Sequence, residues 1–270
     1  MRRVRLLIAY DGTEFCGWQV QDGVRTVEGD LMKALSRVLD RPLDQVKFQG
    51  ASRTDSGVHA LGQVAHFDYD APDRGLWDFV RGLNGLTNDD VLVSYASYVD
   101  DDFNARFDAR GKIYRYKIWS HRFPHPLERR RRWNTLDELD IERMQQAAEH
   151  LVGEHDFEAF RAASCQSPTS VREMRRVEVI GELPDIQIVV EGTAFLKYMV
   201  RVIAGTLVEV GTGRLDPDIT RRMLETGERG IGGMTAPPHG LTLERIFYPN
   251  HPWPEGTPVI GGGYMPSDAQ

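Results

Sequence analysis

The chain has 270 residues, longer than a typical single domain, and its 33 basic and 40 acidic residues give a net charge of −7. This balance excludes a wholly basic nucleic-acid coat protein, and two cysteines are too few for a disulfide framework or a thiolate metal cage. No stretch approaches the roughly 20 apolar residues of a membrane-spanning helix, and the N-terminus alternates charged with apolar residues instead of forming a signal-like run. We therefore expect a cytoplasmic protein.

The first part of the chain alternates between strand and helix patterns. Apolar residues at every second position predict strands, whereas apolar residues three and four positions apart predict helices. The strands are expected at 4–10, 45–52, 62–70 and 91–99. The helices are expected at 26–40, with Thr26 as N-cap, and at 76–86. This βαββαβ order is the ferredoxin-like arrangement.

The second part repeats this order of elements without repeating the sequence. Its strands are expected at 112–120, 171–181, 185–192 and 241–249. Its helices are expected at 140–153, ended by Gly153, at 194–211, and from Asp216 onward.

Two such units predict an α+β fold with two ferredoxin-like βαββαβ halves, whose antiparallel sheets are joined side by side around a central cleft. We place the N-terminal half at 1–105 and the C-terminal half at 106–248. The tail at 249–270 is rich in Pro and Gly and is expected to be an extended arm or disordered. The helix at 194–211 has more apolar surface than one side of a sheet needs, which favours a homodimer.

Positive charge is concentrated in one part of this acidic protein. Residues 105–133 hold ten basic residues and two acidic ones. The run "RRRR" alone fits a solvated loop, but its neighbours His121, Phe123 and His125 favour RNA, since bases stack on rings while cations bind phosphate. The basic run consists of Arg129, Arg130, Arg131 and Arg132.

The stretch "QGASRTDSGVHALGQ" at 49–63 holds one carboxylate, Asp55, among residues typical of a turn. Asp55 and Ser56 can accept backbone N–H bonds, and Gly57 can adopt a positive φ. The same carboxylate could be a chemical reagent, and local composition leaves both interpretations open. His59 has no metal-ligand spacing around it, so we expect it to be a hydrogen-bonded structural residue.

Five motifs follow one another along the chain: "RTDSGVHALGQVAHF", "FNARFDARGKIYRYKIW", "LVGEHDFEAF", "FLKYMVRVIAGTL" and "TAPPHGLTLERI". Together they resemble the tRNA pseudouridine synthases of the TruA type, from about residue 4 to residue 248. The resemblance implies isomerisation of uridine to pseudouridine in the tRNA anticodon stem-loop, at positions thirty-eight to forty. It also implies a homodimer that uses no cofactor and no metal.

The resemblance assigns roles to five residues of this chain. Asp55 matches the catalytic aspartate, and Arg53 matches the arginine two positions before it. Tyr114 matches the active-site tyrosine, which also contacts the substrate. Arg201 matches the basic residue that pairs with the aspartate, and Leu241 matches the leucine of the substrate pocket.

The chain departs from the family pattern at four positions. Ser52 stands where Gly is usual and Asn104 where His is common, and Tyr198 and Val202 differ within "LKYMVRV". None of the four is a reagent, so these departures concern backbone approach and RNA contacts and not the reaction.

The implied reaction fits these residue types. Uridine must lose its C1′–N1 bond, turn its base and rejoin through C5 with no net redox change, so one carboxylate suffices. Asp55 could act as a nucleophile or as a base, and the sequence does not choose between them. Tyr114 could stack on the base, Arg201 could neutralise Asp55 across the cleft, and Arg53 could fill the gap that a flipped base leaves.

Two other functions compete with this one. A non-catalytic RNA-binding protein would explain the sheets and the basic run, but not a set of residues that match one active site. A glycosidase needs two facing carboxylates, and the available Asp11 and Asp68 have no convincing context.

Overall fold

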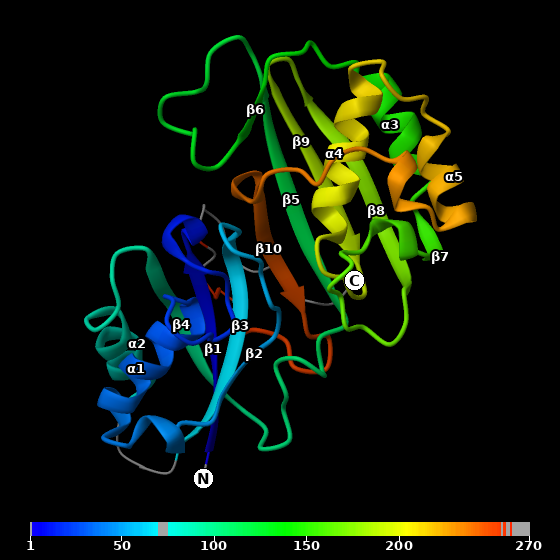
Figure 1. The fold of residues 1–270 in the computed structure, drawn as a ribbon. Coiled ribbons are helices and arrows are strands. Elements are labelled where there is room, and N and C mark those ends of the chain that lie inside the picture. The colour runs from blue at the N-terminus through cyan, green and yellow to red at the C-terminus, as the bar shows by residue number, and fades with distance from the viewer. Residues whose placement is uncertain (1, 70–74, 255, 258–259, 261–270) are drawn as a thin grey trace. The chain divides into compact units, whose positions relative to one another are not determined.

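Two units make up the computed structural model, which describes residues 2–69, 75–254, 256–257 and 260 (Figure 1). The first unit holds the residues up to Arg110 and those from Leu243 onward, and the second is Gly111–Thr242. Both contain helices and strands, which confirms a mixed α+β fold. The boundary at 105 and 106, which rests on the repeated order of elements, remains a prediction.

The first unit follows the expected βαββαβ order and adds the last strand of the chain. Its elements are β1 (Arg2–Tyr10), α1 (Val27–Leu39), β2 (Phe48–Gly50), β3 (His59–Tyr69), α2 (Leu76–Asn84), β4 (Val91–Val99) and β10 (Leu241–Phe247), which enters this unit at Leu243. The strand order is β4-β1-β3-β10, and β2 pairs with β3. The central strand β1 is antiparallel to both β3 and β4.

Capping and apolar spacing explain the helices of this unit. Thr26 has extended φ and ψ, and its side chain accepts a hydrogen bond from Gly29 N, so the predicted N-cap of α1 is confirmed. The helix ends at Asp40, which adopts the left-handed conformation with φ of 51°. On α2 the buried Phe79 packs edge-on against Phe67 of β3, with ring centroids 5.7 Å apart.

A buried arginine holds the chain after β10 against the first unit. Arg5 of β1 is 2% exposed, and its guanidinium donates to the carbonyls of His251 and Pro252 at 2.5 and 3.1 Å. It also lies 3.6 Å from the ring centroid of Trp253, which is itself 6% exposed. Residues 249–254 are therefore ordered and packed against the first unit, and most of the remaining tail lies outside the described residues.

The second unit has a four-stranded antiparallel sheet in the order β5-β9-β8-β7, and a short β6 pairs parallel to β5. Its elements are β5 (Gly111–Ser120), β6 (Trp133–Thr135), α3 (Ile141–Glu149), β7 (Gly153–Asp156), β8 (Val171–Glu182), β9 (Asp185–Gly192), α4 (Met199–Gly211) and α5 (Ile219–Thr226). The helix α3 begins after Asp140 as expected, but Gly153 opens β7 instead of ending the helix.

The apolar helix α4 is shorter than predicted and is buried within its own unit. It starts at Met199 and not at 194, because Tyr198 has φ of 66° and cannot continue a right-handed helix in the N-terminal direction. Along it Ile203 and Leu207 are fully buried, and the backbone of 233–234 lies directly against Gly205. Its apolar residues therefore already have partners, so this helix no longer argues for a homodimer.

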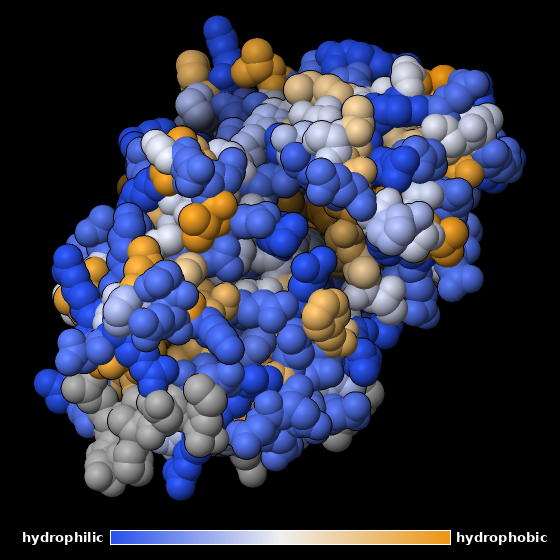
Figure 2. All heavy atoms as spheres, turned by 60° about the horizontal axis from the view of Figure 1, so that its bottom comes forward, coloured by the Kyte–Doolittle hydropathy of each residue, from blue (hydrophilic) through white to orange (hydrophobic). Residues whose placement is uncertain are grey.

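Figure 2 shows one face of the molecule, on which hydrophilic residues predominate and hydrophobic ones are scattered in small groups. Single exposed apolar residues of this kind are normal for a folded protein. This face gives no support for the homodimer, which remains a prediction.

His66 is a buried titratable group of the first unit. It is 7% exposed, and its Nδ1 accepts a hydrogen bond from Ala105 N at 3.2 Å. Burial, helped by the charge of Arg3, lowers the pKa of His66 to about 4. His66 is therefore protonated near pH 6.5 in the unfolded chain but only near pH 4 in the folded chain. As a result, the free energy of unfolding falls as the pH drops from 6.5 towards 4.

We expect His66→Gln to remove part of this acid sensitivity. In the wild type, His66 should account for a loss of up to about 3 kcal/mol in the free energy of unfolding between pH 7 and pH 4. Urea unfolding at pH 7 and pH 4 measures the difference, with His121→Gln as the exposed control. Equal pH dependence in wild type and His66→Gln would contradict the assignment.

Candidate active site

Asp55 lies in the loop 51–58, which leads from β2 into β3. Its carbonyl accepts a hydrogen bond from Val58 N at 3.1 Å, and Gly57 has φ of 78°. The loop is therefore a tight turn, as the composition allowed. Within it Thr54 is buried, whereas the Asp55 side chain is half-buried.

The backbone that follows β1 holds this turn in place. Trp18 N donates to the Thr54 carbonyl at 3.1 Å, and Gly57 N donates to the Phe15 carbonyl at 3.3 Å. Each end of the turn is thus hydrogen-bonded to the segment 12–18, and Asp55 lies between the two contacts.

Two glycines allow the segment 12–18 to come this close. A Cβ on Gly12 would overlap the carbonyl of Val58. A Cβ on Gly17 would lie 2.8 Å from the Thr54 carbonyl oxygen, and Gly17 also has φ of 89°. Both positions need glycine because backbone meets backbone there.

Buried side chains also hold the turn and the segment 12–18 in place. Tyr10 Oη and Thr54 Oγ1 share a hydrogen bond of 2.7 Å. His59 is 5% exposed, and its Nδ1 accepts from Gly12 N at 3.0 Å and lies 3.2 Å from Asp11 Oδ1. The structural role predicted for His59 is confirmed.

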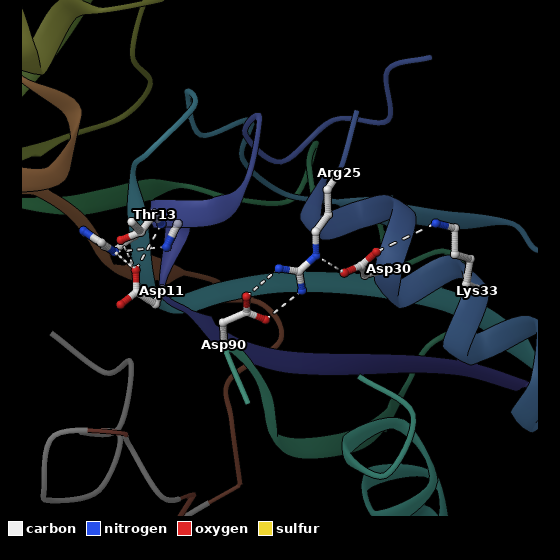
Figure 3. Close-up of polar contacts among 8 residues, drawn as sticks. Asp11, Thr13, Arg25, Asp30, Lys33 and Asp90 are labelled. Carbon is white, nitrogen blue, oxygen red and sulfur yellow. Dashed lines mark hydrogen bonds and ion pairs between the residues drawn. The ribbon is translucent and has the colours of Figure 1, made fainter. Parts of the chain in front are cut away.

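Arg25 fixes the far end of the same segment (Figure 3). Its guanidinium donates to both carboxylate oxygens of Asp90, at 2.6 and 2.8 Å, and to Asp30 at 2.8 Å. The hydrogen bond to Asp90, with the smaller effect of Asp30, raises the pKa of Arg25. The Arg25 carbonyl accepts from Cys16 N at 2.9 Å, and the guanidinium lies 4.1 Å from the Phe15 ring centroid. The segment that is hydrogen-bonded to the two ends of the Asp55 turn is therefore itself anchored.

Arg53 is exposed, and its side chain makes no hydrogen bond within the described part of the chain. The charged group that it influences is Glu28, at the start of α1. Burial raises the pKa of Glu28, while hydrogen bonds from Val20 and Trp18 and the charge of Arg53 act against this rise. Arg53 thus remains available to bind an anionic ligand.

The two other carboxylates considered from the sequence serve the structure. Asp11 accepts hydrogen bonds from the backbone and side chain of Thr13, at 3.0 and 2.5 Å (Figure 3). Asp68 pairs with Arg3 at 2.7 and 3.1 Å, and the hydrogen bond from Arg3 lowers the pKa of Asp68. Neither context supports a carboxylate pair of the glycosidase kind.

In the second unit, Tyr114 and Leu241 are almost fully buried. Tyr114 lies opposite Val190 of β9, is 6% exposed and meets Phe195 edge-on with ring centroids 5.0 Å apart. Leu241 is 5% exposed and is the first residue of β10. Both positions suit a pocket wall better than a solvent-facing contact.

Arg201 lies in the first turn of α4 and is held at two points by Ala236. Its Nε donates to the Ala236 carbonyl at 2.8 Å, and its own carbonyl accepts from Ala236 N at 3.0 Å. The guanidinium carbon lies 4.6 Å from the ring centroid of Tyr198. Tyr198 itself has the left-handed conformation, with φ of 66°, directly before α4 begins.

The segment after Ala236 is fixed against Tyr116. Tyr116 Oη donates to the Pro237 carbonyl at 2.7 Å, and a Cβ on Gly240 would lie 2.6 Å from the Tyr116 ring. Burial raises the pKa of Tyr116, while the charge of Arg201 opposes the rise. The contacts of the segment 236–240 therefore position both Arg201 and the chain that leads into Leu241.

The predicted site residues thus fall into two groups. Asp55 and Arg53 belong to the first unit, whereas Tyr114, Arg201 and Leu241 belong to the second. The pairing of Arg201 with Asp55 remains a prediction.

The side chains of the basic run differ in their exposure. Arg129, Arg130 and Arg131 are exposed. Arg132 is 14% exposed and forms ion pairs with Glu128 and with Asp185. Arg132 therefore ties the loop to β9.

Within the described ranges, no three or more His, Cys, Asp or Glu side chains gather in a way that could bind a metal ion. Among the same residues, no helix is long and apolar enough to span a membrane.

Comparison with known proteins gives the same assignment along most of the chain. The family model described as tRNA pseudouridine synthase matches residues 6–108 and 147–249. The tRNA pseudouridine synthase A of Myxococcus xanthus is 47% identical over 261 residues, which cover 96% of this chain and 96% of that protein. This chain belongs to the tRNA pseudouridine synthase family. Proteins of the same name from Geotalea uraniireducens and Acetivibrio thermocellus are 45% and 41% identical and cover 92% of this chain and 100% of their own lengths.

The two matched stretches contain most of the candidate site. Asp55 and Arg53 fall in the first, and Arg201 and Leu241 fall in the second. Tyr114 and the whole basic run lie between them.

Sequence patterns missed the residues that hold the Asp55 turn in place. Gly12, Gly17, Tyr10 and Arg25 are separated from Asp55 by about 30 to 45 positions, so local spacing carries no sign of the contact. The only local signal was the Asp-Gly pair at 11–12, which is typical of a turn.

Gly17→Ala should disturb the Asp55 turn, and Gly23→Ala provides a matched control. Both glycines have positive φ, of 89° and 76°, so both variants acquire backbone strain, but nothing lies within 4 Å of a Cβ on Gly23. We expect Gly17→Ala to lower the free energy of unfolding by about 1–2 kcal/mol more than Gly23→Ala, measured by urea denaturation. Equal losses would show that Gly17 and Thr54 are not tightly packed.

Proposed function

We propose that this chain isomerises uridine to pseudouridine in the anticodon stem-loop of tRNA, at positions thirty-eight to forty, with Asp55 as the catalytic carboxylate. The observation that carries the proposal is a half-buried carboxylate on a turn that glycines and backbone hydrogen bonds fix, in a chain of this family. A fixed turn favours catalysis because the carboxylate need not be ordered when the substrate binds.

Asp55 would serve the reaction in one of two ways. As a nucleophile it would attack the substrate and hold one fragment while the uracil turns. As a base it would remove a proton from the sugar and later return it. In both cases the C1′–N1 bond breaks, a C1′–C5 bond forms, C5 loses a proton and N1 gains one, so the reaction needs no net oxidation or hydrolysis.

The remaining residues would bind and orient the nucleotide. Tyr114 and Leu241 would contact the turning base, and Arg201, already oriented by Ala236 and Tyr198, would neutralise Asp55. Arg53 would occupy the gap that the flipped base leaves in the stack. These roles, the two ferredoxin-like halves joined around a cleft, and the homodimer all belong to the proposal.

The alternative is a non-catalytic RNA-binding protein. Its exposed arginines would be the same, so RNA binding does not separate the two functions. What favours catalysis is the fixed turn around Asp55, which a binding protein would not need.

Asp55→Asn should fold normally, bind tRNA and make no pseudouridine, since the amide keeps the shape of the side chain but loses nucleophile and base. Pseudouridine is mapped as a carbodiimide-resistant adduct on a transcript whose mass stays constant. Asp44→Asn, at an exposed carboxylate, should retain full activity. If Asp55→Asn kept a few per cent of the wild-type turnover, Asp55 would not be the catalytic carboxylate.

The triple change of Arg129, Arg130 and Arg131 to Ala should weaken tRNA binding and reduce its salt dependence, because each arginine that neutralises a phosphate releases counterions. The slope of log K against log salt should fall by about 0.7–0.9 for each phosphate that is no longer neutralised. Arg222→Ala, at an exposed arginine on α5, is the control.

Arg132→Ala should instead lower the free energy of unfolding, since it breaks the ion pairs with Glu128 and Asp185.

An unchanged salt slope in the triple variant would contradict the RNA-binding role of Arg129, Arg130 and Arg131. These side chains would then be ordinary solvated residues of a loop.

A further inference from the structure

The segment 229–236 runs from the end of α5 across α4 towards β10 (Figure 1). It contains three glycines, which lose more conformational entropy on folding than other residues do. Its last residue, Ala236, makes both backbone contacts that hold Arg201. The orientation of Arg201 therefore depends on how this glycine-rich stretch is fixed.

Close packing against α4 fixes one side of the segment. A Cβ on Gly233 would lie 2.5 Å from the Gly205 carbonyl oxygen, so backbone meets backbone there. Gly233 N donates to Thr206 Oγ1 at 3.1 Å, and the buried Thr206 hydroxyl donates to the Val202 carbonyl at 2.9 Å. The helix thus pairs the amide of the buried Gly233, whose carbonyl needs a partner of its own.

Arg229 supplies that partner from the start of the segment. Its Nη1 donates to the Gly233 carbonyl at 2.7 Å, and its Nη2 donates to Thr235 Oγ1 at 3.3 Å. One guanidinium therefore bridges residues four and six positions further along the chain. Ala236, the next residue, is fully buried, so the bridge ends directly before the contacts with Arg201.

The position of Arg229 costs free energy that its hydrogen bonds must offset. The side chain is half-buried, and burial lowers the pKa of Arg229 because it disfavours the charged form. The two oxygens that accept from it are neutral, so hydrogen bonds and not an ion pair provide the compensation. A lysine lacks the planar fork that reaches two oxygens at once, so the bridge needs a guanidinium.

We propose that Arg229 is a positioning residue, which fixes the segment 233–235 so that Ala236 holds the Arg201 guanidinium in one orientation for the reaction. The inference rests on the proposed function for the role of Arg201. Arg229 contacts neither substrate nor Asp55 in this account, and it acts through Ala236.

Amide hydrogen exchange tests whether Arg229 holds the segment. In Arg229→Ala, the amides of Gly233 and Ala236 should exchange about 10- to 150-fold faster than in the wild type, the factor for loss of a hydrogen bond from a charged donor. Arg229→Lys keeps the charge but not the bridge and should resemble Arg229→Ala more than the wild type. Arg222→Ala, at an exposed arginine on α5, should leave both amides at the wild-type rate. Unchanged exchange in β9 excludes global unfolding.

Single-turnover pseudouridine formation on an unmodified tRNA transcript tests whether this order matters for the reaction. With saturating enzyme, Arg229→Ala should react about 10- to 100-fold more slowly, because a displaced Arg201 is no longer aligned. Transcript affinity should stay within about twofold of the wild type, since Arg229 does not contact the RNA. A merely structural role would lower the stability but leave the rate of the folded enzyme unchanged.

The proposal is overturned if Arg229→Ala leaves the exchange of both amides unchanged, or if this variant of an active enzyme reacts at the wild-type rate. An equal loss of transcript affinity and rate also overturns it, because Arg229 would then bind RNA. Wild-type behaviour of Arg229→Lys contradicts the bridge and would assign the effect to charge alone. A wild type that makes no pseudouridine contradicts the proposed function, and the exchange result still decides whether Arg229 fixes the segment.

Discussion

The candidate site depends on the direct backbone contact between the segment 12–18 and the turn that carries Asp55. Gly12 and Gly17 make this contact possible, and hydrogen bonds to Thr54 and Gly57 fix it. A carboxylate on an unsupported loop would have to be ordered in every catalytic cycle, whereas here the folded chain has already met that entropic cost. The contacts that stabilise this part of the first unit therefore also position Asp55.

The second unit fixes its candidate residues in a comparable way. Gly205 lets the chain at 233–234 lie against α4, and Ala236 then binds Arg201 through backbone and side chain. Tyr198 adds a ring beside the same guanidinium. Both units thus use close backbone packing to orient a charged side chain, although their sequences share no motif.

Sequence patterns predicted the elements whose causes are local and missed those with distant causes. Thr26 marked the start of α1 because an N-cap acts within one turn. The apolar run at 194–211 could not reveal that Tyr198 turns left-handed, and the Pro- and Gly-rich tail gave no sign that Arg5 binds it from β1. Motif resemblance made Asp55 the candidate, but the residues that hold its turn, such as Gly17 and Arg25, are too distant in sequence for local spacing to reveal them.

The central claim is that this chain converts uridine to pseudouridine in the anticodon stem-loop with no other change to the RNA. The most direct test incubates the purified wild-type protein with an unmodified tRNA transcript, maps carbodiimide-resistant adducts by position and weighs the RNA. The account predicts adducts confined to the anticodon stem-loop and an RNA of unchanged mass. Release of free uracil, or a transcript that binds the protein and remains without adducts, would contradict it.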